Sequence, residues 1–429
     1  MANVIVVGAQ WGDEGKGKVV DYLTESADLV VRYAGGANAG HTLVLGDQRL
    51  VVHLLPSGVV HPEKRCLLGA GMVIDPQGLL EEIQTCRDMG VAIDPERVRI
   101  SELAHVILPY HKEIDGLRDQ GSDAIGTTRR GIGPCYEHKM TRRGVRMWQL
   151  ARPDELAAAL DNTLPAVNAQ LVQLGGEPAD RDDLLERYTA IGATLAPYLC
   201  DISRTVSDAM DQGDAVLFEG AQGSLLDIDY GTYPYVTSSS TIAGGACTGA
   251  GVGPTRIDGV VGIAKAYQTR VGNGPFPTEL SGDLEATLRE RGQEYGATTG
   301  RPRRCGWLDV VTLRRAARIN GLTSLAMTKL DVLGGLPKLR LCTSYTLDGR
   351  SLDDLPPSTK DMERLEPVYE ELDGFDQDIT GARTTEALPE NARRYLRRVE
   401  TLVGVPIGLV SVGPRRSETI VLENPFGER

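Results

Sequence analysis

Six short apolar runs, spread along the 429-residue chain, constrain its possible folds most strongly. They rarely alternate with polar residues, so each indicates a strand buried on both faces, as in parallel sheets covered by helices. Helical segments separate them, including residues 76–89, 154–174 and 182–212, the last interrupted near Pro197. The apolar runs are residues 4–7, 29–31, 215–218, 260–264, 325–327 and 407–410. This pattern predicts an α/β fold with a large, mostly parallel central sheet flanked by helices.

The length alone would allow about three domains. However, no repeat, low-complexity tract or Pro/Ser-rich linker divides the chain. We therefore expect one domain over residues 1–429, with a helical insertion at about residues 100–212 and small β insertions.

Charge and composition exclude several classes of protein. The formal net charge is −13 and aromatic residues make up only 5%, so neither a basic footprint nor a stacking surface for nucleic acid is expected. No stretch approaches 18 consecutive apolar residues, which excludes a membrane span, and no leader pattern precedes the first strand. The seven cysteines are dispersed without a C-x-x-C pair, so neither a zinc site nor a disulfide framework is indicated. A cytoplasmic location follows as the default.

A glycine- and lysine-rich segment, GDEGKGK at residues 12–18, follows the first apolar run. It matches the first seven positions of the P-loop pattern G-x-x-x-x-G-K-[ST], whose backbone N–H groups surround a phosphate. The eighth position is Val19, where that pattern has a hydroxyl for magnesium. Asp13 would repel phosphate unless it binds a metal or takes a proton. An ordinary strand-to-helix turn is the alternative, but the dense charge favours a P-loop NTPase-like nucleotide site.

Polar motifs also follow three later apolar runs. These are FEGAQG at residues 218–223, TKLD at 328–331 and SVG at 411–413. Ligands of open α/β sheets bind outside the carboxyl ends of the strands, so several such motifs reinforce one another. The TKLD motif has the form of a guanine-reading motif, because its carboxylate can accept from guanine N1–H and the exocyclic amine. An isolated TKLD is more often a surface turn, but beside a P-loop-like segment it favours GTP over ATP.

Further loops have compositions that suit anionic ligands. In the segment of residues 35–42, the Gly40 carbonyl is a candidate metal ligand and His41 a candidate donor to a phosphoryl oxygen. Residues 124–134 and 235–240 mix small donors in the manner of phosphomonoester sites. Residues 297–304 carry three arginines, which bind carboxylate and phosphate bidentately, although a solvated basic loop is the alternative.

These motifs closely resemble those of the adenylosuccinate synthetase family, in the same order from residue 3 to residue 427. The resemblance is carried by QWGDEGKGK (10–18), NAGHT (38–42), FEGAQG (218–223), GTYPYVTS (231–238), GPFPTE (274–279) and TKLD (328–331). It implies a GTP-dependent ligase that joins IMP to L-aspartate and forms adenylosuccinate, GDP and phosphate through 6-phosphoryl-IMP, the first committed step from IMP to AMP.

The resemblance also implies roles for individual residues. Asp13 would act as the base that removes the purine N1 proton, His41 as the acid, and Lys16 as a stabiliser of the transferred charge. GTP is expected to contact Gly12, Glu14, Gly15, Lys16, Gly17, Lys18, Gly40, His41, Thr42, Arg303, Lys329, Leu330, Asp331, Ser411, Val412 and Gly413. IMP is expected to contact Asp13, Asn38, Ala39, Thr128, Arg142, Gln222, Thr237 and Arg301. L-aspartate is expected to contact Ala297, Thr298, Thr299, Gly300, Arg301 and Arg303. One Mg²⁺ per subunit is expected at Asp13 and Gly40.

Two positions bear on assembly and on local differences from the family. Arg142 corresponds to the family arginine that reaches the substrate phosphate across a homodimer interface. At Arg129, bacterial relatives commonly carry glycine, so an added cation is expected to tighten or crowd the phosphate loop.

Two other functional classes remain as alternatives. A GTP-dependent switch would hydrolyse GTP without a second substrate, and a dinucleotide-dependent oxidoreductase would need a correctly placed G-x-G-x-x-G.

Overall fold

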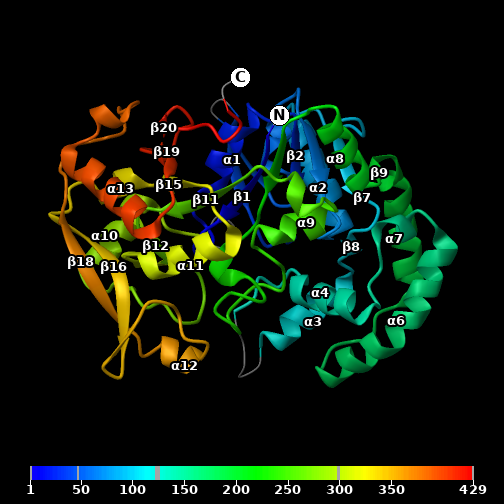
Figure 1. Cartoon of the computed structure of the whole chain (residues 1–429). Helices are drawn as coiled ribbons and strands as arrows, with labels where there is room; N and C mark the ends of the chain where they lie inside the picture. Colours follow the sequence, from blue (N-terminus) through cyan, green and yellow to red (C-terminus); the bar gives the residue numbers. More distant parts are fainter. Residues whose placement is uncertain (1, 46–47, 121–125, 297–299, 428–429) are drawn as a thin grey trace.

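The computed structural model describes residues 2–45, 48–120, 126–296 and 300–427. Within these residues a ten-stranded central sheet has the order β20-β19-β15-β11-β1-β10-β2-β5-β7-β9 (Figure 1). Its strands are β1 (Asn3–Gly8), β2 (Leu29–Arg32), β5 (Arg65–Leu68), β7 (Val98–Ser101), β9 (Leu199–Cys200), β10 (Val216–Glu219), β11 (Gly259–Lys265), β15 (Ser324–Thr328), β19 (Ile407–Ser411) and β20 (Thr419–Val421). Neighbouring strands are parallel except for β20, which is antiparallel to β19.

All six strands expected from the apolar runs are present, and they are adjacent in the sheet from β19 through β1 to β2. This confirms the predicted α/β fold with a mostly parallel sheet. The strands that apolar runs did not reveal are β5, β7, β9 and β20, which complete the two sides of the sheet. They are short or include charged residues such as Arg65 and Arg99, because strands toward the margins of a sheet are less completely enclosed.

The longer helices follow the predicted segments closely. Residues 76–89 form α2 (Pro76–Asp88) and residues 154–174 form α6 (Pro153–Gln173). The segment of residues 182–212 divides at Pro197 into α7 (Arg181–Leu195) and α8 (Ile202–Asp211), with β9 between them. Among the described residues, no helix is long and apolar enough to cross a membrane. The remaining helices are α1 (Lys16–Thr24), α3 (Pro109–Arg118), α4 (Ile132–Thr141), α5 (Met147–Leu150), α9 (Gly244–Ala250), α10 (Gly282–Gly292), α11 (Val310–Asn320), α12 (Thr359–Met362) and α13 (Glu390–Val403).

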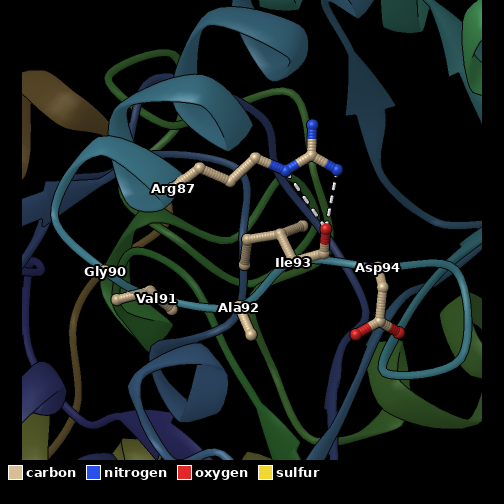
Figure 2. Close-up of a pocket in the computed structure, with 6 residues that line it drawn as sticks. All are labelled: Arg87, Gly90, Val91, Ala92, Ile93 and Asp94. Atoms are coloured by element: carbon tan, nitrogen blue, oxygen red, sulfur yellow. Dashed lines mark hydrogen bonds between the residues drawn. The ribbon is translucent and has the colours of Figure 1, made fainter.

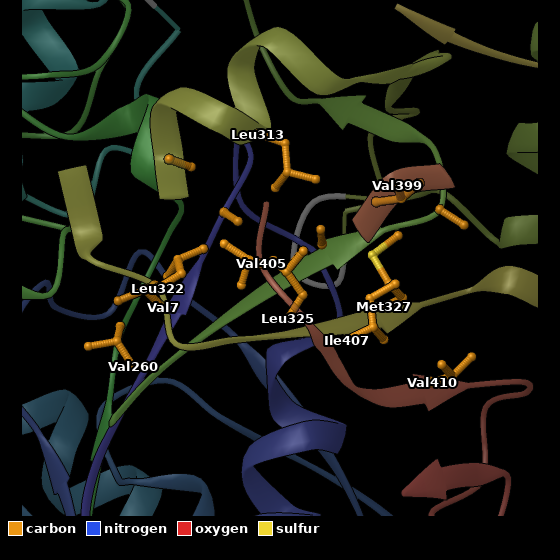
Figure 3. Close-up of a cluster of buried hydrophobic side chains, with 14 of the residues drawn as sticks. Val7, Val260, Leu313, Leu322, Leu325, Met327, Val399, Val405, Ile407 and Val410 are labelled. Atoms are coloured by element: carbon orange, nitrogen blue, oxygen red, sulfur yellow. The ribbon is translucent and has the colours of Figure 1, made fainter. Parts of the chain in front are cut away.

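The hydrophobic core divides into two large clusters because successive side chains of a strand point to opposite faces. In β1, Val4 and Val6 belong to one cluster, whereas Ile5 and Val7 belong to the other. Figure 3 shows part of the second cluster, where Leu313 of α11 and Val399 of α13 lie over strands β15 and β19. Helices α1 and α2 contribute to the first cluster.

Smaller sheets surround this central layer. A hairpin of β3 (His41–Leu45) and β4 (Gln48–Val52) follows the second strand. β6 (Val73–Ile74) pairs with β8 (His105–Val106), and β12 (Gln268–Arg270) pairs with β13 (Arg304–Gly306). The remaining small sheet contains β14 (Leu308–Asp309), β16 (Lys338–Leu347), β17 (Arg350–Leu352) and β18 (Glu366–Asp373), with β16 and β18 at the left of Figure 1.

The parallel arrangement places the polar motifs at one edge of the sheet. Strands β1, β2, β10, β15 and β19 run in the same direction, and each is followed by one of the segments identified from the sequence. Their carboxyl ends therefore share an edge, which is where open α/β sheets bind ligands.

Candidate active site at the carboxyl edge of the sheet

The loop after β1 is shaped from within by a buried carboxylate. Glu14 Oε1 accepts hydrogen bonds from the backbone N–H groups of Gln10 (3.1 Å) and Gly12 (2.8 Å), and Glu14 Oε2 is ion-paired with Lys16. Gly15 caps α1 with φ 86°, a left-handed conformation that favours glycine. Lys16 is therefore held inside the loop, at the helix N-terminus where an anion is favoured.

The loop after β10 packs directly on this first loop. A Cβ added to Gly223 would collide with the Gln10 carbonyl oxygen and the Gly12 nitrogen, so only glycine fits at that contact. The FEGAQG motif thus serves partly to bring two loops together, which the sequence pattern alone did not explain.

Lys18, the last residue of the P-loop-like segment, contacts the segment after β19. Its Nζ donates to Ser411 Oγ (2.7 Å), the Gly413 carbonyl (2.7 Å) and the Glu418 carbonyl (2.9 Å). Burial lowers the pKa of Lys18 to about 8, although Glu418 and Asp331 oppose the shift. Lys18 therefore ties α1 to the segment after β19, and its expected contact with GTP stays a prediction.

Asp13 lies in the same loop with a left-handed backbone (φ 57°). Its side chain is 41% exposed, and its Oδ2 lies 3.0 Å from Arg303 Nε. The candidate base is therefore accessible at the sheet edge and is paired with an arginine from the loop that was expected to bind L-aspartate.

His41, at the start of β3, is held by a buried carboxylate at the end of β10. His41 Nδ1 lies 2.5 Å from Glu219 Oε1 and 2.9 Å from Ser57 Oγ. Ser57 also donates to Glu219 through its hydroxyl and its backbone N–H, each at 2.7 Å. Burial alone would raise the pKa of Glu219, but His41 and Arg32 lower it, so this side chain stays ionised. A carboxylate on Nδ1 leaves Nε2 as the nitrogen that can serve a ligand.

Gln222 carries a side-chain amide that the protein does not satisfy. Within the described part of the chain, its buried Oε1 and Nε2 have no hydrogen-bond partner. The backbone of Gln222 is left-handed (φ 56°), which is uncommon for a residue other than glycine. A Cβ added to Gly35 would lie 3.1 Å from Gln222 Oε1. Leaving a buried polar group unpaired costs about 1–3 kcal/mol. The amide is therefore a strong candidate for contact with a ligand between the loops after β1 and β2.

Two further segments meet beside this cluster. A Cβ on Gly133, in the first turn of α4, would lie 3.4 Å from Ser238 Oγ. The segment containing Thr128 therefore lies close to the segment containing Thr237. The backbone N–H of Thr237 donates to the Leu226 carbonyl (2.9 Å). Both segments had been identified as phosphomonoester-binding from composition.

The TKLD motif is tied to the first loop. Thr328 Oγ1 donates to the Glu14 carbonyl (2.5 Å), and a Cβ on Gly15 would lie 3.7 Å from the Thr328 side chain. Lys329 has a left-handed backbone (φ 58°), and its Nζ lies 3.2 Å from Glu294 Oε1. Burial raises the pKa of Asp331, although Lys329 and Lys18 oppose the shift.

A pocket of about 350 Å³ lies elsewhere, beside Arg87 and residues 90–94 (Figure 2). This loop leads from α2 into β7 and so lies at the opposite edge of the sheet from the motifs above. Its arginine is already used, because Arg87 donates to the Ile93 carbonyl and to Tyr198 Oη. No residue of the candidate site lines it.

Comparison with known proteins shows the family of the chain. The family model described as adenylosuccinate synthetase matches residues 5–420. The chain belongs to the adenylosuccinate synthetase family. It is an enzyme of this ligase class, whose activity is the GTP-dependent joining of IMP and L-aspartate in purine biosynthesis.

Individual adenylosuccinate synthetases match over nearly their full length. The protein from Moorella thermoacetica is 54% identical over 99% of this chain and 100% of its own length. The one from Pelobacter propionicus is 53% identical over the same shares. A solved structure of the fully ligated adenylosuccinate synthetase from Plasmodium falciparum has a TM-score of 0.92 and 39% identity, and covers 98% of this chain and 100% of that chain.

Arg142 lies apart from the other expected IMP contacts in this adenylosuccinate synthetase family member. It is the exposed C-cap of α4, whereas Thr128 precedes the other end of that helix. A ten-residue helix is about 15 Å long. Delivery of Arg142 by a second subunit therefore remains a prediction.

Arg129 pairs with protein rather than projecting into the phosphate loop. Its exposed side chain places Nε 3.2 Å from Asp119 Oδ2, and its backbone is left-handed (φ 55°). Glycine would adopt this left-handed conformation without strain. The expected tightening or crowding of the loop stays a prediction.

Other expected contacts are placed only in part. Ala297, Thr298 and Thr299 lie outside the described residues. Gly300 and Arg301 are exposed, and the Arg301 carbonyl accepts from Gly296 N–H (2.8 Å). Asn38 Oδ1 accepts from Gly36 N–H (3.3 Å) within the loop after β2. Ala39 and Gly40 of that loop are partly exposed. The expected guanine contacts Leu330, Val412 and Gly413 are buried. Thr42 is exposed beside Gly17, which is buried.

Sequence reasoning missed the roles of Glu219 and Ser57. Ser57 lies far from any glycine-rich motif, so no local signal marked it. Glu219 had a signal, because a carboxylate at the end of an otherwise apolar, fully buried strand needs a buried partner.

Proposed function

We propose that this enzyme forms adenylosuccinate in two steps, through 6-phosphoryl-IMP, with Asp13 as base and His41 as acid. One observation above all supports the proposal. The accessible Asp13 carboxylate, the Glu219-held imidazole of His41 and the unpaired Gln222 amide are carried by loops that meet at one edge of the sheet. Such a set can deprotonate a purine, bind its heteroatoms and donate to a phosphoryl group at the same place.

In the first step, Asp13 takes the N1 proton of IMP, and the released electron pair makes O6 nucleophilic. O6 then bonds to the γ-phosphorus of GTP while the bond from that phosphorus to the bridging oxygen breaks, releasing GDP. His41 Nε2 donates to the transferring phosphoryl group, and Lys16 stabilises its charge. Such transfer depends mainly on positioning and electrostatics, which matches loops that are fixed by internal hydrogen bonds.

In the second step, the amine of L-aspartate bonds to C6 and the C6–O6 bond breaks. Phosphate leaves with O6, and the amine releases a proton. Arg303 and Arg301, with the donors of the loop over residues 297–300, would hold the aspartate carboxylates bidentately. Asn38, Ala39, Thr128, Gln222, Thr237 and Arg301, with Arg142 of the second subunit, would hold IMP.

The residues present suit one Mg²⁺ held by Asp13 and the Gly40 carbonyl. Mg²⁺ commonly uses one or two carboxylates together with substrate phosphates rather than a cage of protein ligands. Accordingly, the described residues contain no group of three His, Cys, Asp or Glu side chains that would hold a metal alone. When bound, the ion would neutralise charge on the phosphates of GTP.

The guanine edge of the site would be formed by TKLD and the segment after β19. Asp331 would accept from guanine N1–H and the exocyclic amine, and the Lys329 stem would pack over the ring. A homodimer and a cytoplasmic location are part of the same proposal. The location is supported by seven free thiols, because thiols stay reduced in the cytosol.

The testing experiment is phosphate release by the purified enzyme with Mg²⁺ and GTP, omitting IMP or L-aspartate in turn. We expect release to require both substrates and to accompany a new ultraviolet-absorbing nucleotide. In addition, [γ-¹⁸O]GTP should pass its label to phosphate, while oxygen from [6-¹⁸O]IMP should also appear in that phosphate. Release from GTP alone, indifferent to IMP and aspartate, would indicate a switch-type GTPase and refute the proposal. Absence of the IMP oxygen from phosphate would refute the 6-phosphoryl intermediate.

A further inference from the structure

Glu294, two residues after α10, is a fully buried carboxylate at the centre of a cationic cluster. Its Oε2 accepts from Lys265 Nζ (2.8 Å) and from Arg303 Nη1 (2.7 Å). Its Oε1 accepts from Tyr267 Oη (2.5 Å) and lies 3.2 Å from Lys329 Nζ. Neither the motifs nor the two-step reaction assigns this residue a role.

The cations around Glu294 belong to different parts of the site. Lys329 is the lysine of the guanine-reading motif. Arg303 contacts the Asp13 carboxylate and follows the loop proposed to hold L-aspartate. One carboxylate therefore touches both the nucleotide side and the amino-acid side.

Glu294 also closes the base of the aspartate loop through its backbone. Its carbonyl accepts from Arg303 N–H (2.9 Å), and the next residue, Tyr295, forms a β-bridge with Pro302. Arg303 is thus fixed to Glu294 twice, once through its main chain and once through its guanidinium.

The charges of this cluster make Glu294 hard to replace. Among the described residues, Lys265, Arg303 and Lys329 form ion pairs with the carboxylates of Glu294 and Asp13, and Lys329 also acts on the Asp331 carboxylate. Burial alone would raise the pKa of Glu294, but Lys265, Lys329 and Arg303 lower it, so it stays ionised. Without it, the buried cations would repel one another and lose a shared position.

We propose that Glu294 is a positioning residue that couples guanine nucleotide binding to L-aspartate binding, because its one carboxylate orders both Lys329 and Arg303. The inference rests on the proposed function. A ligand that fixes Lys329 also fixes Glu294, and through it Arg303, so the second ligand has less ordering to complete. Such shared ordering produces positive cooperativity between the two sites.

The test measures this coupling in the absence of turnover. GDP lacks the γ-phosphoryl group, so its affinity can be measured by calorimetry with IMP and Mg²⁺ present, with and without L-aspartate. We expect aspartate to tighten GDP binding at least about fivefold in the wild type, within the usual range of coupling energies. In Glu294→Gln, aspartate should tighten GDP binding by less than about twofold. The affinity of this variant for IMP alone should stay within about twofold of the wild type. A purely structural role would weaken all three ligands together.

Asp283→Asn is the matched control, because the same change from carboxylate to amide falls on an exposed residue in the first turn of α10. It should keep the wild-type coupling. If Glu294→Gln does not fold, Glu294→Gln/Lys265→Met removes one buried cation with the carboxylate, and the same thresholds apply to it.

Coupling that persists in the Glu294 variant, or is absent from the wild type, would overturn the inference. Synthesis of adenylosuccinate by the wild type is measured in parallel. A wild type that turns over without coupling therefore contradicts only Glu294, whereas a wild type that does not turn over contradicts the proposed function.

Discussion

At the scale of single residues, the protein supports two of the proposed catalytic groups, Asp13 and His41, with partners from other segments of the chain. Asp13 contacts Arg303, and His41 contacts Glu219 and Ser57. These partners hold the reacting atoms in one orientation before substrate arrives.

Asp13→Ala should largely preserve the binding of IMP while turnover falls. General base catalysis contributes about 10²- to 10⁴-fold, and we expect a loss of at least that size in kcat. Steady-state assays measure kcat, and calorimetry with IMP alone measures binding. Near-normal turnover in this variant would eliminate Asp13 as the base.

Glu219→Gln should lower kcat by about 10- to 100-fold, as is common when an outer partner of a functional histidine is changed. The neutral amide holds His41 Nδ1 less firmly than the carboxylate does, so Nε2 should be oriented less well toward the phosphoryl group. The KM for GTP should change little. Steady-state kinetics measure both constants, and a kcat equal to that of the wild type would show that Glu219 serves only packing.

The same variant has a predictable effect on stability. The pKa of Glu219 is lower in the folded protein than its unfolded value of about 4.3, so its stabilisation is complete above that pH. It disappears as pH falls through the lower folded-state pKa. Urea unfolding between pH 3 and pH 7 should therefore show a steeper acid loss in the wild type than in Glu219→Gln. Equal slopes would contradict this linkage.

At the scale of elements, apolar runs predicted the six central strands because a strand buried on both faces must be apolar throughout. Strands β5 and β7 escaped notice because Arg65 and Arg99 interrupt their apolar character. The site was predictable to the extent that motifs follow strand ends. Contacts such as Lys18 with Ser411 were not, because they join segments that only the folded sheet brings together.

That contact yields a prediction for the segment after β19. The pKa of Lys18 is lowered by burial to about 8, so above that pH its amine loses one of three donated hydrogens. The guanine edge should then loosen, and the KM for GTP should rise as pH passes through 8. Lys18→Arg stays charged throughout and should lack this rise. A pH-independent KM in the wild type would separate Lys18 from the guanine edge.

At the scale of the whole molecule, the role expected for Arg142 predicts that each active site is shared between two subunits. Asp13→Ala and Arg142→Ala should each be nearly inactive as purified homodimers. When the two are mixed and allowed to exchange subunits, one site of each mixed dimer should contain both native residues, and activity should return. Assays of adenylosuccinate synthesis before and after mixing measure the recovered activity. Each variant mixed with itself is the control. Failure to recover activity despite exchange would place Arg142 outside the partner's site.

The order of strands in the central sheet also has a consequence during synthesis. β1 lies between β10 and β11, so neither of its neighbours exists when it leaves the ribosome. At about 5–20 residues per second, roughly 10–40 s pass before β10 is made. Throughout that time the apolar run of residues 4–7 in β1 has two unpaired edges. Nascent chains stalled before residue 216 should therefore be bound by chaperones that recognise exposed strands.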